Sequence, residues 1–256
     1  MSNLTGKVAL VSGSSKGIGK AIAKKLLEEG AIVYITGRNS KDLNDTYLEF
    51  QNISSDRINQ FCADLTNIDN IKKLMHVIIQ KNNMLDILVA NIGTGRFSSG
   101  WDISDEEWEK CMELNLFSSI KITREAIKIM EINGSGNIIL MSSIAGCESI
   151  SAPITYSTAK AGLLAYMKST SHTIGSSGIR INAISPGNIY FKGGTWYNKM
   201  QEDKEKTIHY ISDNVPLHKF GIPEDIAEVV CFLVSEKSQF ITGANFVIDG
   251  GQTRCL

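Results

Sequence analysis

The sequence has no long apolar run and no strong excess of charge of one sign. No segment approaches the ~20 consecutive apolar residues that a membrane-spanning helix needs. The formal net charge is −1 at pH 7, so no global basic field attracts the protein to nucleic acid or to anionic lipid. Residues 1–7 also lack the apolar core of a signal peptide. We therefore expect a cytoplasmic protein whose partners include neither a membrane nor a nucleic acid.

Cysteine and histidine are scarce and scattered. The cysteines are odd in number and contain no C-x-x-C pair. They are Cys62, Cys111, Cys147, Cys231 and Cys255. The histidines, which show no spacing typical of metal ligands, are His76, His172, His209 and His218. This distribution argues against a disulfide framework and against a zinc site. We expect free thiols in a reducing compartment and no metal.

Short apolar runs of strand length alternate with longer helical patterns along the 256 residues. We expect strands near 8–12, 32–36, 58–62, 87–91, 137–142, 180–185 and 245–248. We expect helices near 17–29, 40–51, 67–81, 105–133, 156–175 and 223–235. The inner strands lack polar alternation, as strands buried on both faces do. The pattern predicts a single α/β domain over 1–256: a Rossmann fold, with a doubly wound parallel seven-stranded sheet and helices on both faces.

The least regular region is 187–214. A segment of this size without regular structure in a compact domain is usually functional, so we interpret it as a substrate loop or lid. It carries Tyr190, Phe191, Trp196 and Tyr197. These large side chains can wall a compact apolar pocket. The alternative is that they only pin the segment to the body of the domain.

A glycine-rich turn follows the first expected strand and opens the next helix. It reads Gly13-Ser14-Ser15-Lys16-Gly17-Ile18-Gly19. Glycines permit a tight turn and close backbone approach, and a helix N-terminus offers free N–H groups to a pyrophosphate. Glycines also mark ordinary turns, but the position at the first βα junction favours nucleotide binding.

The end of the second expected strand bears on the choice of cofactor. It reads Thr36-Gly37-Arg38-Asn39, where an NAD site usually has an Asp or Glu for the ribose 2′-hydroxyl. Without that acid, Arg38 and Lys16 suit a 2′-phosphate, unless both are only solvated surface charges. We predict NADP(H) as the preferred cofactor, with NAD(H) as the other candidate. Asp64, after the third strand, either accepts from the adenine amino group or caps the following helix.

Tyr156 and Lys160 are four residues apart, so they lie on the same face of a helix, one turn from each other. A lysine ammonium at that distance favours the phenolate, and we expect it to lower the pKa of Tyr156 and make a usable general acid/base. Ser143, thirteen residues upstream, can hold the oxygen of a carbonyl or alcohol. Ser142 is the competing serine, which we interpret as a strand-end residue.

These motifs together resemble the short-chain dehydrogenase/reductase family over nearly the whole chain. The matching segments are Ser12-Gly13 with Gly17-Ile18-Gly19, Ala90-Asn91-Ile92-Gly93, Asn115, Ser143, Tyr156 with Lys160, Pro186-Gly187 and Ile248-Asp249-Gly250-Gly251. The resemblance implies hydride transfer between a nicotinamide and a carbonyl carbon. It implies that Tyr156 moves the proton on oxygen, Ser143 positions that oxygen, Lys160 binds the nicotinamide ribose and Asn115 holds a relay water.

The same resemblance implies a set of cofactor contacts. They are Gly13, Ser15, Lys16, Gly17, Ile18, Gly19, Arg38, Asp64, Leu65, Asn91, Gly93, Tyr156, Lys160, Pro186, Gly187 and Ile189. It also implies a homo-oligomer, a tetramer, with interfaces on 105–133, 156–175 and 223–256. One departure is Phe191, which stands where the family often has a threonine that contacts the cofactor. Thr195 is a candidate to supply that contact.

In length and C-terminus the sequence looks most like bacterial 3-oxoacyl-acyl-carrier-protein reductases. Those commonly carry carrier-docking arginines in two stretches that correspond here to 131–137 and 175–178, and both stretches lack cations. We therefore predict an NADP(H)-dependent enzyme that interconverts a small-molecule ketone or aldehyde and its alcohol. The alternative is 3-oxoacyl-acyl-carrier-protein reductase of fatty-acid synthesis. A nucleotide-binding regulator without catalysis would have no physical need for the Tyr–Lys pair.

Overall fold

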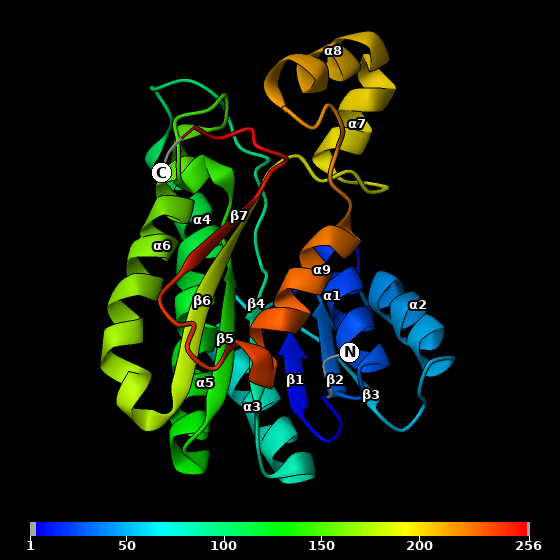
Figure 1. Cartoon of the computed structure of the whole chain (residues 1–256), viewed down its shortest axis with the longest axis vertical. Coiled ribbons are helices and arrows are strands. Elements are labelled where there is room, and N and C mark those ends of the chain that lie inside the picture. Colours follow the sequence, from blue (N-terminus) through cyan, green and yellow to red (C-terminus); the bar gives the residue numbers. More distant parts are fainter. Residues whose placement is uncertain (1–3, 255–256) are drawn as a thin grey trace.

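The alternating pattern forms one seven-stranded parallel sheet, with the strands in the order β3-β2-β1-β4-β5-β6-β7 (Figure 1). The strands are β1 (Val8–Val11), β2 (Ile32–Gly37), β3 (Ile58–Cys62), β4 (Ile87–Ala90), β5 (Gly136–Met141), β6 (Ile179–Pro186) and β7 (Asn245–Ile248). This is a computed structural model that describes residues 4–254, so Cys255 lies outside the described residues. The predicted fold class is confirmed.

Helices cover both faces of the sheet. They are α1 (Gly17–Glu28), α2 (Ser40–Gln51), α3 (Ile68–Asn82), α4 (Asp105–Met112), α5 (Ser118–Asn133), α6 (Ile154–Ile174), α7 (Thr195–Glu202), α8 (Lys204–Asn214) and α9 (Pro223–Leu233). Ala9 and Val11 of β1 belong to a core with α1, α2 and α9, whereas Val8 and Leu10 belong to a core with α3, α5 and α6. Successive side chains of a strand point to opposite faces, so each strand contributes to both cores.

The strand order reverses between β1 and β4, because β2 and β3 extend to one side of β1 and β4 to β7 to the other. The connections that follow β1 and β4 therefore diverge, and they leave a crevice at the carboxyl ends of these strands. Ligands of open α/β sheets bind at such a switch point. Both the glycine turn and Asn91 lie there, directly after β1 and β4.

The segment 187–214 is not a loop throughout, and this expectation was wrong. Residues 195–214 form α7 and α8, which Figure 1 shows beyond the carboxyl ends of the strands. Helix α7 buries none of its residues and α8 buries only Thr207 and Ile211, so the sequence carries little of the apolar periodicity that identifies a helix. Only 187–194 remains irregular.

The aromatic residues of this region pack mainly against one another. The ring of Trp196 lies 5.2 Å from that of Tyr210 and 5.5 Å from that of Phe220, measured between centroids. Tyr190 lies 5.5 Å from Phe220 and 6.0 Å from Tyr197. This cluster fixes α7 and α8 to the loops that carry Tyr190 and Phe220, whereas Phe191 lines a cavity.

The expected helix over 105–133 is divided by a π-helix at Glu113–Phe117, which contains Asn115. Single π turns inside helices widen the backbone locally and are frequent at functional sites. Among the helices of residues 4–254, none is long and apolar enough to span a membrane.

Candidate active site

The turn after β1 requires glycine at positions 13, 17 and 19. Gly13 and Gly17 have φ of +62° and +58°, in the left-handed region. A Cβ on Gly19 would lie 2.4 Å from the carbonyl oxygen of Gly13 and 2.5 Å from the side-chain nitrogen of Asn91. That nitrogen also donates to the carbonyl oxygens of Ser12 at 3.2 Å and Gly13 at 3.0 Å, which holds the turn in place.

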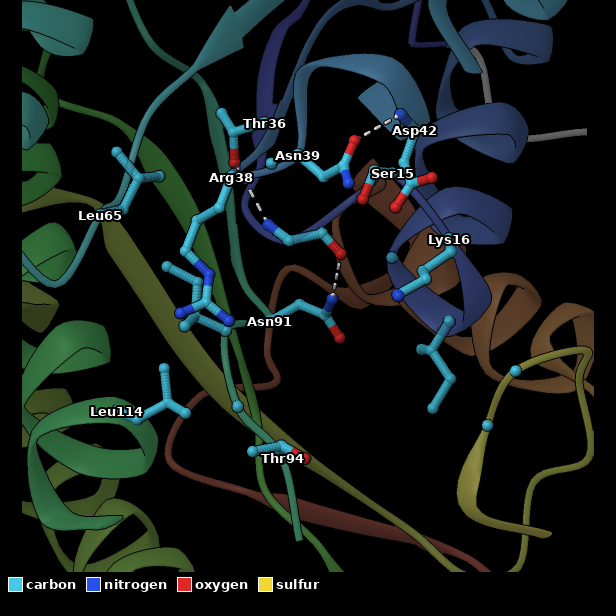
Figure 2. Close-up of a pocket in the computed structure, with 18 of the residues that line it drawn as sticks. Ser15, Lys16, Thr36, Arg38, Asn39, Asp42, Leu65, Asn91, Thr94 and Leu114 are labelled. Carbon is cyan, nitrogen blue, oxygen red and sulfur yellow. Dashed lines mark hydrogen bonds between the residues drawn. The ribbon is translucent and has the colours of Figure 1, made fainter. Parts of the chain in front are cut away.

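A cavity of about 680 Å³ opens over this turn. Figure 2 shows Lys16, Thr36, Arg38, Asn39 and Asp42 around one end, with Thr94 and Leu114 toward the other. The predicted cofactor residues that line it are Gly13, Ser15, Lys16, Ile18, Gly19, Arg38, Asp64, Leu65, Asn91 and Gly93. The sequence analysis grouped these residues although they come from four separate connections, those that follow β1, β2, β3 and β4.

The end of the cavity near α2 carries Lys16 and Arg38 together with Asp42. Asp42 was missed, because it lies in the first turn of α2 and not at the end of β2 where an NAD-binding acid is expected. Asp64 is not the cap of α3, since that position belongs to Asn67. Its carboxylate instead accepts from the backbone N–H of Thr66 at 3.0 Å and from the Thr66 hydroxyl at 2.9 Å.

The four predicted catalytic residues meet beside the opposite end. The Tyr156 hydroxyl is hydrogen-bonded to the Ser143 side chain, and the Lys160 ammonium lies 5.7 Å from the Tyr156 ring centroid. A Cβ on Gly93 would lie 2.7 Å from Oδ1 of Asn115 and 3.2 Å from Nζ of Lys160, and one on Gly95 would lie 3.7 Å from the Tyr156 ring. The tetrad thus lies behind the wall formed by residues 93–95, which line the cavity.

The two neighbouring serines have different surroundings. Ser142 is buried and its hydroxyl donates to the carbonyl oxygen of Lys160 at 3.0 Å. Ser143 caps a short 3-10 turn by accepting from the N–H of Ala145 at 3.2 Å, and it is the serine that contacts Tyr156. Ser142 therefore holds helix α6 against β5, which leaves Ser143 as the serine that faces the tyrosine.

Burial is the main cause of the pKa shifts of Tyr156 and Lys160. It raises the pKa of Tyr156, and the hydrogen bond from Ser143 only partly opposes it. Burial lowers the pKa of Lys160 to about 8. The expectation that Lys160 lowers the pKa of Tyr156 is wrong. The reason is that loss of hydration disfavours both charged forms, while the ammonium donates to the carbonyl oxygen of Met141 at 2.7 Å and not to the phenol.

Cys111 is a neighbour of the tetrad that sequence reasoning did not single out. It is fully buried, and the side-chain nitrogen of Asn115 donates to its carbonyl oxygen at 3.2 Å and to its sulfur at 3.4 Å. Oδ1 of Asn115 accepts from the N–H of Thr94 at 2.8 Å. The Asn115 side chain is thus fully engaged within the protein. The spacing of four residues on one helix was the only sequence signal for the cysteine.

Six predicted cofactor residues do not line the cavity, and two of them, Tyr156 and Lys160, lie behind residues 93–95. Pro186 and Ile189 are buried, and a Cβ on Gly187 would lie 2.6 Å from that of Asp249. Gly17 is covered by Phe191, whose ring would lie 2.6 Å from a Cβ at that position. Phe191 itself lines the cavity, as do Gly193, Gly194 and Thr195.

The residues present fit a nicotinamide dinucleotide. The glycine positions leave no room for Cβ atoms. Lys16, the N-cap residue of α1, makes no side-chain hydrogen bond to the helix backbone, so the first N–H groups of α1 are free for a pyrophosphate. The cavity runs from Lys16 and Arg38 at one end to residues 93–95, in front of Tyr156, at the other. The first end suits the phosphate of a dinucleotide, and the second suits its reacting ring.

Known proteins resemble this chain over nearly its whole length. Residues 13–253 match the family model described as enoyl-(acyl carrier protein) reductase. The 3-oxoacyl-acyl-carrier-protein reductase of Rickettsia felis is 35% identical over 251 residues, which are 98% of this chain and 98% of that protein. The protein of that name from Thermotoga maritima is 31% identical over 248 residues, covering 97% and 98% of the two chains.

Solved structures show the same similarity. L-sorbose reductase from Gluconobacter frateurii, in complex with NADPH and L-sorbose, has a TM-score of 0.93 with 27% identity and covers 98% of each chain. A short-chain type dehydrogenase/reductase from Mycobacterium marinum has a TM-score of 0.89 with 27% identity, covering 98% of this chain and 97% of that one.

Proposed function

Because the chain belongs to the short-chain dehydrogenase/reductase family, we propose that it is an NADP(H)-dependent enzyme acting on a free small-molecule ketone or aldehyde and the corresponding alcohol. The observation that carries this proposal is the Ser143–Tyr156 hydrogen bond beside a buried Lys160, at the end of a dinucleotide-sized cavity. The family acts on carbonyl and CH–OH groups through a nicotinamide cofactor. The NADPH bound to the sorbose reductase supports the choice of phosphate-bearing cofactor.

In the proposed reaction the bound nicotinamide supplies or accepts the hydride. Ser143 donates a hydrogen bond to the substrate oxygen and places that oxygen beside the Tyr156 hydroxyl. In the reducing direction Tyr156 gives its proton to this oxygen, and its raised pKa keeps the phenol protonated at neutral pH. Lys160, still largely protonated below its pKa of about 8, stabilises the phenolate that remains.

The backbone around Asn115 supports the proton path. The π-helix at Glu113–Phe117 displaces the regular hydrogen-bond pattern at this residue. We propose that a water bound at this widened turn returns the proton to Tyr156. The hydrogen bonds of the Asn115 side chain to Thr94 and Cys111 hold the turn beside Lys160.

We expect NADPH to be preferred over NADH because of Arg38 and Lys16. A charge-assisted hydrogen bond to phosphate is worth about 1.5–3 kcal/mol, or roughly tenfold to over a hundredfold. Arg38→Asp should narrow or reverse the ratio of kcat/KM for the two cofactors, since a second carboxylate then joins Asp42 at this end. Lys41→Asp is the matched control, because Lys41 is an exposed cation three residues further along the chain, in α2, and does not line the cavity. Equal or better kcat/KM with NADH in the unmodified protein would contradict the preference.

A second candidate, reduction of 3-oxoacyl groups on acyl carrier protein, is favoured by the names of the relatives at 31–35% identity. Against it, the stretches 131–137 and 175–178 offer no cation. The nearby Arg180 is turned inward, and its guanidinium donates to the carbonyl oxygens of Ile241 at 3.0 Å and Leu233 at 2.8 Å. It is therefore committed to the fold and not available to an acidic carrier.

The test of the proposed function is a direct competition of substrates. NADPH oxidation is measured with acetoacetyl-acyl carrier protein and with free ketones of similar size. We expect higher kcat/KM with a free ketone. A tenfold advantage of the carrier-bound substrate, equal to about 1.4 kcal/mol, would establish the second candidate instead.

We also propose that the protein is a homo-oligomer, a tetramer. The support is a set of exposed large apolar side chains on the regions that the family resemblance assigns to interfaces. They include Phe117, Ile132, Phe232, Phe240 and Val247. Burying such side chains between subunits would remove them from water.

A further inference from the structure

The segment that follows β4 is held rigidly beside Tyr156. At its start the N–H of Thr94 donates to Asn115, and at its end the N–H and hydroxyl of Ser98 donate to the Glu107 carboxylate at 2.5 and 2.9 Å. Between these two anchors, Gly95 faces the Tyr156 ring. The backbone that carries Arg96 is therefore positioned one residue away from the proposed reaction centre.

Arg96 is the charged residue of the cavity lining at the tyrosine end. The other charged residues that line the cavity are Lys16, Arg38, Asp42 and Asp64, which belong to the turn after β1, the connection from β2 into α2 and the segment after β3. Arg96 is exposed, and no ion pair joins it to an acid among residues 4–254. A cation without a carboxylate partner, at the mouth of a proposed catalytic site, is a receptor for an anion.

The guanidinium has the donors to act in this way. Nη2 of Arg96 donates to the carbonyl oxygen of Gly193 at 2.9 Å, which joins the segment after β4 to the loop before α7 across the cavity. A guanidinium has five N–H donors, so one bond to the loop leaves a pair free for a planar anion. The same bond aims the side chain along the cavity wall.

We propose that Arg96 binds an anionic group of the substrate, and that the substrate is a carbonyl compound bearing a carboxylate or phosphate a few bonds from the reacting carbon. This inference rests on the proposed function and narrows its substrate class. Carboxylate and phosphate share the geometry that a guanidinium recognises, and the substrates of the test distinguish them. In the competing role, which we call the latch role, the hydrogen bond from Arg96 to Gly193 only holds the segment after β4 to the loop before α7.

The test compares substrates that differ only in charge. Acetoacetate is paired with methyl acetoacetate, and dihydroxyacetone phosphate with dihydroxyacetone, and kcat/KM is measured with saturating NADPH. We expect wild-type protein to favour the charged member of at least one pair by tenfold or more. Arg96→Gln should lose about tenfold to a hundredfold on that charged substrate, the usual worth of a charge-assisted hydrogen bond, and less than threefold on its neutral partner. Arg96→Lys should recover part of the loss. The control is Lys192→Gln, which removes an exposed cation of the loop that carries Gly193, outside the cavity lining, and should change neither activity.

Several outcomes would overturn the assignment. Equal losses on charged and neutral substrates would show the latch role alone, and a wild-type preference for the neutral member of both pairs would exclude an anion receptor. A tenfold loss of NADPH affinity in Arg96→Gln, measured by NADPH fluorescence, would assign the residue to the cofactor.

If none of the four compounds is turned over, binding of the two charged compounds tests the role of Arg96 instead. Acetoacetate and dihydroxyacetone phosphate should then raise the melting temperature of NADP⁺-loaded wild-type protein and not that of Arg96→Gln, and the absence of this difference would overturn the inference. Failure of the proposed function itself is distinguishable, because it appears as no NADPH oxidation with any carbonyl compound while NADPH still binds.

Discussion

Tyr156→Phe is expected to lower kcat by about 10²–10⁴-fold, the usual contribution of a general acid, while the fold and NADPH binding remain intact. Phenylalanine keeps the ring that packs against Gly95 and removes only the hydroxyl that meets Ser143. Because burial already raises the pKa of Tyr156, the residue holds its proton at neutral pH and acts as the acid of the proposed reaction, whereas Ser143 only holds the substrate oxygen. Steady-state kinetics, NADPH fluorescence titration and thermal melting measure the three quantities.

Tyr166→Phe is the matched control for this variant. Tyr166 lies on the same helix, α6, is also partly buried, and hydrogen-bonds Thr170 rather than a residue of the site. Its loss should leave kcat unchanged. Retention of more than a tenth of wild-type activity by Tyr156→Phe would refute the role proposed for Tyr156.

Lys160→Met is expected to remove most activity without weakening the fold at neutral pH. The variant loses the charge that stabilises the phenolate, so kcat should fall by at least about a hundredfold, within the range typical of acid–base groups. Burial, however, lowers the pKa of Lys160 from 10.5 to about 8, so keeping the ammonium inside the folded protein at pH 7 costs about 3 kcal/mol. Methionine relieves this cost, and the loss of the hydrogen bond to Met141 offsets only part of the gain.

The stability difference between the wild type and Lys160→Met is expected to depend on pH. Between about pH 8 and 10.5 the unfolded chain binds a proton on Lys160 that the folded protein has released, so wild-type stability rises with pH in this window relative to the variant. Below pH 8 both states are protonated and the cost is fully present. Denaturant unfolding of both proteins at pH 7 and pH 9.5 measures the difference. A variant that is clearly less stable at pH 7, by an amount that does not change with pH, would contradict the account.

Lys168→Met controls for the loss of a lysine from the same helix. Lys168 is exposed and its ammonium donates to the carbonyl oxygen of Gly243 at 3.0 Å, away from the cavity. This variant should retain wild-type kcat.

Features of the site that depend on neighbouring residues in the chain could be predicted from the sequence. The turn from Gly13 to Gly19 and the one-turn spacing of Tyr156 and Lys160 are local geometry, so residue type and spacing carry them. Helices α7 and α8 escaped prediction because they bury few side chains and are held by aromatic contacts to Tyr190 and Phe220. Asp42 escaped because nothing in its local sequence indicates that it faces the cavity, and Cys111 had only its spacing of four residues from Asn115 as a signal.

The sequence by itself determined the alternation of strands and helices and the glycine turn, because hydrophobic periodicity and short-range spacing encode them, whereas the tetrad was predicted from the family resemblance. Only the tertiary structure decided the directions of the pKa shifts of Tyr156 and Lys160. Dehydration of Tyr156 and Lys160 is set by segments far apart in the chain, and it reversed the expected direction of the tyrosine pKa. The Arg96–Gly193 bond joins residues 97 positions apart and was invisible to any local pattern. Burial and long-range contact depend on the packing of the whole chain, and no window of sequence contains them.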